Sequence, residues 1–234
     1  MMKFFGRALR VLFSSPLRIP FLLIKLLICK IRSIYYSSKI DNGGGKIIIK
    51  NPFIRFKIQK DKSSELFIKG NLVITPHVGG NNSIIIKMGV NSKFRINGDF
   101  VIGQGVRFFL ESNSTLTIGG KDKESASGIT ADTLIMVYKN IEIGRDFLCA
   151  WNVFISDSDW HTIGGQSHQA DVIIDDHVWV ANSCSILKGA IISENCIIAS
   201  HTKVTNKKFS KNSLIAGVPA HVVKSDISWS RNIC

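Results

Sequence analysis

The chain has 234 residues and a net charge of +13; 45% of its residues are apolar and 20% are charged. This apolar fraction excludes an intrinsically disordered chain, and the length suits one large domain with an appendage. The five cysteines show no CxxC or zinc-finger spacing, so we expect free thiols in a reducing compartment rather than a disulfide framework.

Positive charge is concentrated in residues 1–40, which precede the first acidic residue, Asp41. The segment contains the basic residues Lys3, Arg7, Arg10, Arg18, Lys25, Lys30, Arg32 and Lys39. Such an excess attracts polyanions, and the apolar residues between these charges favour an anionic membrane over nucleic acid. The sequence therefore predicts no nucleic-acid partner.

The apolar stretch 19–28 (IPFLLIKLLI) is too short to span a bilayer, and Lys25 interrupts it. We expect residues 1–40 to be partly helical and to lie on the cytoplasmic face of a membrane. Two alternatives remain: a helix that packs in an oligomer, and a signal peptide, although no clear small-residue cleavage site follows. Gly43–Gly45 is interpreted as a linker to the rest of the chain.

Aliphatic residues recur with a period of six in the C-terminal half. The main series is Ile174, Val180, Ile186, Ile192, Ile198 and Val204. A second series of small or β-branched residues lies two positions earlier, at Val172, Val178, Cys184, Ala190, Cys196 and Thr202. Weaker fragments occur upstream, at Ile96, Ile102, Phe108, Ile141, Phe147 and Val153.

A period of six fits neither an amphipathic helix nor an alternating strand. It predicts a solenoid in which one short strand and its turn take six residues, and three such units close a triangular coil. Stacked coils would place the larger aliphatic side chains in the interior and the small ones near a corner. Cys184 and Cys196 are therefore expected to be core residues without a chemical role.

Residues 173–224 (IIDDHVWVANSCSILKGAIISENCIIASHTKVTNKKFSKNSLIAGVPAHVVK) resemble the hexapeptide-repeat acyltransferases. That family includes the maltose and galactoside acetyltransferases and the acetyltransferases of capsule and lipopolysaccharide synthesis. The resemblance implies an all-β fold, a left-handed parallel β-helix over residues 41–224, with a C-terminal tail at 225–234. It also implies a homotrimer that binds acetyl-CoA between subunits and transfers the acetyl group to a carbohydrate hydroxyl.

The six-residue period fails between Asp157 and Asp171, and such a break predicts a loop that leaves the coil. Acetyl transfer to a hydroxyl needs a base, and an imidazole ordinarily titrates near neutral pH. The family's catalytic histidine corresponds to His161, which is therefore the expected base. A carboxylate could orient its imidazole; Asp159 is the first choice and Asp157 the second.

The resemblance implies further site residues on the coils. Asn152, Trp160 and Trp179 would face the acceptor, although an asparagine stacked at a turn and tryptophans that only pack are alternative interpretations. The residues expected to bind acetyl-CoA are Asn182, Ser200 and Thr205 along the pantetheine arm and Lys224 beside the phosphates. Lys207 and Lys208 are more simply interpreted as a solvated basic edge.

Three other functions agree less well with the sequence. A zinc enzyme on this coil, such as a γ-class carbonic anhydrase, needs three histidines that converge on one metal ion. The spacing of the four candidates, His161, His168, His177 and His201, does not favour such a site. We therefore expect no metal. A non-catalytic scaffold would have no use for the polar loop. Nucleotide-sugar N-acetyltransferases often carry a βαβ domain, and Gly43–Gly45 does not begin one.

The favoured interpretation is an acetyl-CoA-dependent O-acetyltransferase in the cytoplasm. Its acceptor would be a hydroxyl of a surface polysaccharide, in capsule or lipopolysaccharide, or of a precursor. Residues 1–40 would hold the enzyme on the inner face of the cell membrane.

Overall fold

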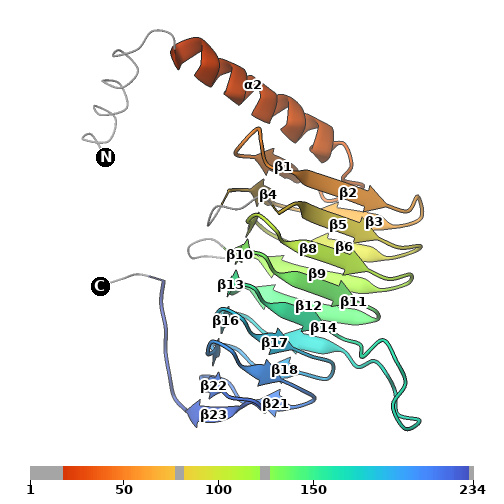
Figure 1. The fold of residues 1–234 in the computed structure, drawn as a ribbon, viewed down its shortest axis with the longest axis vertical. Coiled ribbons are helices and arrows are strands. Elements are labelled where there is room, and N and C mark those ends of the chain that lie inside the picture. Colours follow the sequence, from red (N-terminus) through yellow and green to blue (C-terminus); the bar gives the residue numbers. More distant parts are fainter. Residues whose placement is uncertain (1–17, 77–81, 122–126, 232–234) are drawn as a thin grey trace.

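A computed structural model describes residues 18–76, 82–121 and 127–231. Within those residues, one helix, α2 (Arg18–Ser37), precedes a stack of short strands that wind around a common axis (Figure 1). The expected helical segment is confirmed over residues 18–37, and residues 1–17 lie outside the described part of the chain.

The strands form three sheets, which we call faces I, II and III. Face I consists of β1 (Lys46–Ile49), β4 (Asn71–Ile74), β7 (Phe100–Ile102), β10 (Gly128–Ala131), β13 (Leu148–Trp151), β16 (Trp179–Val180), β19 (Ile197–Ile198), β22 (Leu214–Ala216) and β23 (His221–Lys224). Face II consists of β2 (Phe56–Lys60), β5 (Ile84–Met88), β8 (Arg107–Leu110), β11 (Leu134–Val137), β14 (Phe154–Ser156), β17 (Ser185–Ile186) and β20 (Lys203–Val204). Face III consists of β3 (Glu65–Ile68), β6 (Lys93–Ile96), β9 (Thr115–Gly120), β12 (Asn140–Arg145), β15 (Val172–Ile174), β18 (Ile191–Ile192) and β21 (Lys208–Phe209).

The chain visits face I, face II and face III in turn and then begins the next coil on face I. Neighbouring strands are parallel, except that β23 pairs antiparallel with β22 at the end of the stack. Turns between the faces form three edges of a triangular prism, which we call edges I/II, II/III and III/I. The parallel β-helix predicted from the six-residue period is confirmed.

The core follows the two predicted series. Every residue of both series, from Val172 to Val204, is at most 1% exposed. Val180 pairs with Ile198, so one coil takes eighteen residues here. The identical positions of successive coils therefore stack in a continuous apolar interior, and Cys184 and Cys196 are buried as expected.

The N-terminal coils are longer, and this weakens the six-residue signal there. Ile58 pairs with Ile86, and Phe108 pairs with Ile135, so each of these coils takes more than twenty residues. Strands β9 and β12 have six residues each, and their side chains alternate between the interior and the surface. A period of two within long strands thus replaces the period of six.

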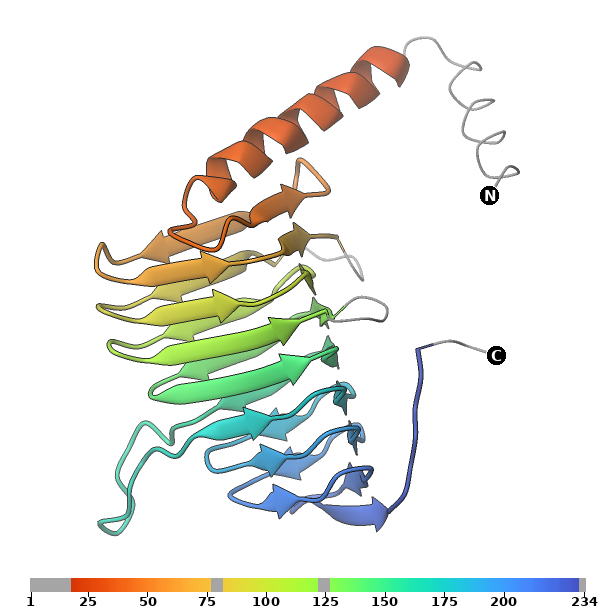
Figure 2. The same cartoon turned by 180° about the vertical axis from the view of Figure 1, so that it is seen from behind.

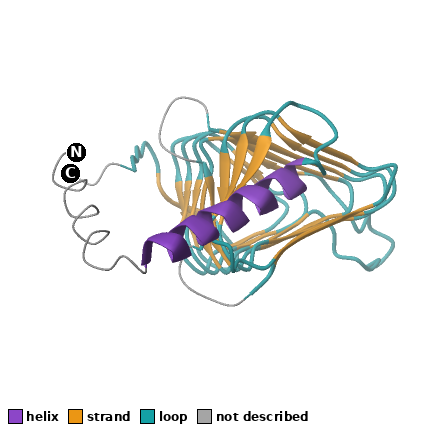
Figure 3. Cartoon of the chain, turned by 90° about the horizontal axis from the view of Figure 1, so that it is seen from above, coloured by secondary structure: helices purple, strands orange, loops and turns teal. Residues whose placement is uncertain are grey.

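Helix α2 lies across the solenoid when seen from above, and it rises obliquely from the first coil toward its own N-terminus (Figures 2 and 3). Strand β1 has no strand above it, and its outer N–H groups are satisfied by serines of α2. Ser37 Oγ accepts from Ile47 N at 2.9 Å, and Ser33 Oγ accepts from Ile49 N at 2.9 Å. Arg32 donates to the carbonyl oxygens of the loop after β1. The helix therefore provides hydrogen-bond acceptors for backbone N–H groups at the edge of the solenoid.

Residues 225–231 run back along edge III/I after β23 (Figures 1 and 2). Ile227 N donates to Asn212 O at 3.0 Å, and the Trp229 ring stacks on His177 with a centroid distance of 4.1 Å. No helix among the described residues is long and apolar enough to cross a membrane.

Candidate functional site

The break in the six-residue period is a loop that projects from edge II/III, between β14 and β15 (Figures 1 and 2). Its two arms pair near the coil, where Asp159 N donates to His168 O at 2.8 Å and Ala170 N donates to Asp157 O at 3.0 Å. Gly164 and Gly165 have φ values of 56° and 75° at its far turn. The loop is therefore a short hairpin, as the chain's departure from the coil predicts.

His161 lies on this loop and is exposed. Trp160, the residue before it, is half-buried and packs edge-on against Tyr138, with ring centroids 5.6 Å apart. Tyr138 also contacts the ring of His168 at 4.6 Å. Trp160 therefore anchors the loop to β11 and its following turn, while His161 stays exposed.

Asp159 forms an ion pair with Lys188, with 2.5 Å between Oδ2 and Nζ. Lys188 also donates to Ser167 O at 2.8 Å, so one ammonium group holds both arms of the loop to the next coil. No sequence pattern points to Lys188, because only the stacking of the coils at edge II/III brings it to the loop. Among the described residues, His161 has no hydrogen-bond partner, so the expected contact between Asp159 and His161 stays a prediction.

Asp157, the second choice for that contact, has a different role. Its carboxylate is buried and accepts three backbone N–H groups at 2.7 Å, from Tyr138, Lys139 and Asn140. Burial raises the pKa of Asp157, and the three backbone hydrogen bonds act in the opposite direction. Both oxygens hold the turn before β12, so Asp157 serves the fold at the base of the loop.

Asp157→Asn should lower the free energy of unfolding by about 2–3 kcal/mol, because the amide NH₂ would face backbone donors and leave buried groups unsatisfied. Urea unfolding of the purified protein measures this. Asp159→Asn is the matched control and should cost under about 1 kcal/mol, because its partner Lys188 is partly exposed. Equal losses for the two variants would contradict the structural role of Asp157.

Three predicted site residues come together along edge I/II. Asn152 Nδ2 donates to Ser183 Oγ at 3.2 Å, and Asn182 Nδ2 donates to the same oxygen at 3.3 Å. Ser200 Oγ donates to Asn182 Oδ1 at 2.7 Å, one coil further on. Amide and hydroxyl groups thus form a ladder over successive turns, and Ser183 is the member that the sequence analysis missed.

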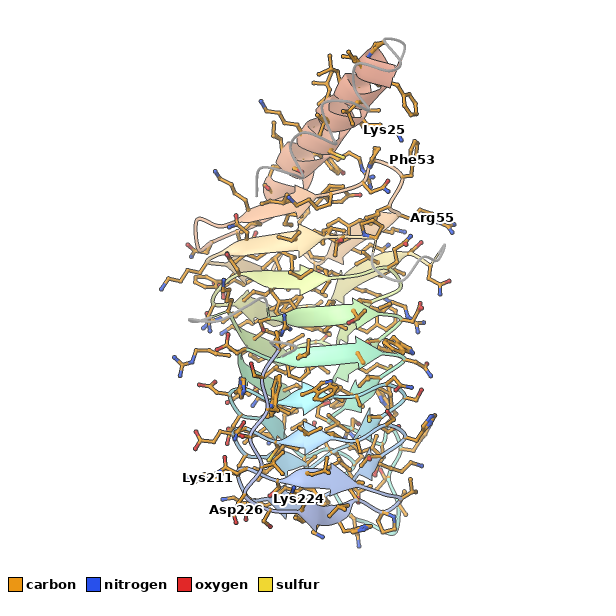
Figure 4. The ribbon with its side chains drawn as sticks, turned by 90° about the vertical axis from the view of Figure 1, so that its left-hand side faces the viewer. Lys25, Phe53, Arg55, Lys211, Lys224 and Asp226 are labelled. Carbon is orange, nitrogen blue, oxygen red and sulfur yellow. The ribbon has the colours of Figure 1, made fainter. Side chains whose placement is uncertain are left out.

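The other two predicted donor-binding residues lie elsewhere. Thr205 is exposed on the turn after β20, at edge II/III. Lys224 ends β23 at the last coil, the end of the solenoid opposite α2 (Figure 4). Neither lies on the ladder of edge I/II, so a single chain does not gather the four predicted donor-binding residues in one place.

Trp179 lies on the outer surface of face I and is 37% exposed. Its ring packs against Trp229 of the C-terminal tail, with centroids 5.9 Å apart. Trp151, at the end of β13 beside Asn152, is 47% exposed and was also missed. Trp151 thus lies beside the ladder of edge I/II, whereas Trp179 lies on face I nearer edge III/I.

Edge II/III, which carries the His161 loop, is opposite face I in a triangular prism. The loop between β14 and β15 and the strand β16 lie on opposite sides of the solenoid (Figures 1 and 2), so His161 and Trp179 of one chain are on opposite sides too. A site that uses both residues needs two chains.

The buried thiols are poor nucleophiles. Burial raises the pKa of Cys149 to about 12, and it also raises the pKa values of Cys184 and Cys196. A thiolate at neutral pH is therefore disfavoured at all three. Within the described ranges, His, Cys, Asp and Glu side chains do not form a group of three or more that could hold a metal ion.

No protein-family profile matches the chain. The chain is 34% identical over 173 residues to a polysialic acid O-acetyltransferase of Neisseria meningitidis, covering 67% of this chain and 79% of that protein. It is 29% identical over 194 residues to a 24.8 kDa protein in the cps region of Klebsiella pneumoniae, covering 79% and 82% of the two chains.

Among solved structures, the chain is similar to the polysialic acid O-acetyltransferase OatWY. The TM-score is 0.54 at 27% identity, and the superposition covers 82% of this chain and 92% of that chain. The sequence comparison and the structural comparison thus both find a polysialic acid O-acetyltransferase.

Proposed function

The chain belongs to the hexapeptide-repeat O-acetyltransferases with a left-handed parallel β-helix, and on this premise we propose that it uses acetyl-CoA to acetylate a hydroxyl of a surface polysaccharide or its precursor. The acceptor would belong to capsule or lipopolysaccharide. The observation that carries the proposal is the exposed His161, on the loop that leaves the coil at the point where the repeats break.

His161 acts as the general base. Its imidazole takes the proton of the acceptor hydroxyl while the oxygen attacks the thioester carbonyl carbon. When the tetrahedral intermediate collapses, the carbon–sulfur bond breaks, and the imidazolium returns the proton to the departing thiolate. The products are an acetyl ester and free coenzyme A, so protons and electrons balance without another reactant.

Asp159 is the proposed orienting carboxylate. It lies two residues before His161, and its ion pair with Lys188 fixes the arm of the loop that carries the histidine. Asp157 is unsuited to this task, because backbone N–H groups occupy both of its oxygens. Lys188 then contributes to catalysis only through the position of the loop.

The working enzyme is a homotrimer. Threefold symmetry can bring edge II/III of one subunit beside face I and edge I/II of the next, and this combines groups that one chain holds apart. His161 and Thr205 would come from one subunit. Trp179 and the amide–hydroxyl ladder would come from its neighbour.

The ladder suits the pantetheine arm of acetyl-CoA, whose two amide groups need both donors and acceptors. Asn182 and Ser200 offer these groups on adjacent coils, and Lys224 would lie toward the cofactor's phosphates. Asn152, Trp160 and Trp179 would line the acceptor and thioester pocket.

Residues 1–40 would hold the enzyme on the cytoplasmic face of the membrane. They carry basic and apolar side chains and no acidic residue, a composition that suits anionic lipid. Polysaccharide precursors assembled at that membrane would then be within reach.

The test is transfer of isotope-labelled acetyl from acetyl-CoA to surface saccharides by the purified protein. We expect labelled ester that mild alkali removes, together with free thiol in equal amount. Alkali-stable label would indicate an N-acetyltransferase. A protein that fails to bind acetyl-CoA would be a scaffold.

A further inference from the structure

Helix α2 is attached to the first coil along one side and exposes apolar side chains along its length. Residues near its C-terminus are fixed on the first coil by Ser33, Ser37 and Arg32, which donates to Pro52 O at 2.5 Å and to Ile54 O at 2.6 Å. The large apolar side chains of α2 that are 45–62% exposed are Phe21, Leu22, Leu23, Ile24, Leu26, Leu27, Ile31, Ile34 and Tyr35. The helix is therefore held firmly but is covered on one side only.

An apolar surface of this kind needs a covering partner. Helix α2 contains no acidic residue, and the first acidic residue of the chain is Asp41. Lys25 lies over the ring of Phe21, with its ammonium 4.3 Å from the centroid, and Phe53 extends beside it at the top of the molecule (Figure 4). Apolar side chains with only positive charges among them match an anionic lipid surface.

A groove between α2 and β1 has the same character. It has a volume of about 560 Å³, and its lining includes Leu26 and Ile34. Three lysines, Lys30, Lys46 and Lys50, also line it. An apolar channel beside ammonium groups suits a lipid with an acyl chain and an anionic headgroup.

The position of α2 determines the distance between the acetyl-transfer site and the membrane surface. The helix lies at one end of the solenoid, so seating it on a membrane makes the coils extend away from the lipid (Figures 1 and 2). Face II passes through β2, β5, β8, β11 and β14 before the His161 loop begins. At about 4.8 Å for each step, the loop is about 20 Å from the first coil, and the helix adds roughly 10 Å.

We propose that α2 seats the enzyme on an anionic membrane and thereby holds the acetyl-transfer site about 30 Å from the lipid surface. The acceptor hydroxyl then belongs to a distal sugar of a membrane-anchored saccharide several sugars long, and not to the sugar attached to the lipid. The choice of acceptor rests on the proposed function, whereas the seating of α2 does not. In a threefold assembly all three helices lie at the same end, so the three sites share one height.

The seating is tested with the full chain on phosphatidylcholine vesicles with and without phosphatidylglycerol. Lys30→Gln, Lys46→Gln and Lys50→Gln together should weaken binding to the anionic vesicles about a hundredfold, at about fivefold for each lysine. The matched control removes the same charge from coils further from α2, with Lys87→Gln, Lys203→Gln and Lys208→Gln. Equal weakening by the two triple variants would overturn the proposal.

The height is tested with fluorescent labels at Leu27→Cys and at Ser167→Cys on the loop, after replacement of Cys29 and Cys234 by serine. The label at position 27 should be quenched by lipid-borne quenchers, and the label at position 167 should not. Energy transfer from position 167 to a lipid dye should correspond to about 30 Å. Quenching of both labels, or of neither, would overturn the proposal. Turnover of acetyl-CoA with a free saccharide, measured separately, shows whether the enzyme assignment itself fails.

Discussion

His161→Ala should lower kcat for acetyl transfer by about 10²–10⁴, with little change in the affinity for acetyl-CoA. The base acts on the acceptor's proton in the transition state and contributes little to ground-state binding of the donor. The assay is release of free thiol under saturating donor and acceptor. Light scattering and urea unfolding should give the wild-type mass and stability, because the His161 side chain is exposed and has no hydrogen bond among the described residues.

Two companion variants refine this result. Asp159→Asn should reduce kcat less than His161→Ala does, because the imidazole remains but is less well oriented. Near-normal turnover by His161→Ala would contradict the assignment. Attention would then move to His177, which stacks on Trp229, and to His201, which lies on the turn at edge I/II.

Mixed trimers of His161→Ala and Trp179→Ala subunits should regain activity that neither variant has alone. The two side chains lie on opposite sides of one chain, so each site would combine His161 of one subunit with Trp179 of the next. Purification through two different tags keeps only trimers that contain both variants, and in each of these about one third of the sites would hold both native residues. Turnover per subunit, after co-expression and purification through two different tags, measures the recovery.

The control is each variant mixed with itself, which should stay inactive. If mixed trimers show no recovery although both single variants are inactive, the two residues must serve the same subunit's site or separate sites. The proposed arrangement between subunits would then be wrong, while His161 could still be the base.

The sequence predicts the β-helix best where the coils are shortest. From Val172 to Val204 each coil takes eighteen residues. Larger aliphatic side chains occupy one buried series and small or β-branched ones the other, so both series can be recognised in the sequence. In the longer upstream coils, strands such as β9 alternate with a period of two, and the turns differ in length. The six-residue signal is therefore weaker there, although Ile102 and Phe108, which belong to its fragments, are as fully buried as the C-terminal series.

The candidate site is less visible in the sequence, because the sequence does not show which edge a residue faces. The break of the period locates the loop and His161. It does not distinguish Asp157, which accepts three backbone N–H groups, from Asp159, which pairs with Lys188. That pairing depends on the stacking of one coil beneath another, and no local pattern near Lys188 indicates it.

The role of α2 is also only partly visible. Its basic and apolar composition indicates a membrane or a partner, whereas its hydrogen bonds to β1 become evident only when the first coil is built. Ser33 and Ser37 look like ordinary polar residues in the sequence, yet their hydroxyl oxygens accept hydrogen bonds from the backbone of the edge strand β1. Removal of residues 29–37 would therefore disturb the fold as well as any membrane contact.

O-acetyl transfer that depends on His161 can be read from the mass of the acceptor saccharide. Wild-type protein, labelled acetyl-CoA and surface saccharide should yield a product heavier by one labelled acetyl group, bound as an alkali-labile ester. His161→Ala should yield almost none in the same time. An unchanged acceptor mass with the wild-type protein, or equal product from both proteins, would contradict the account.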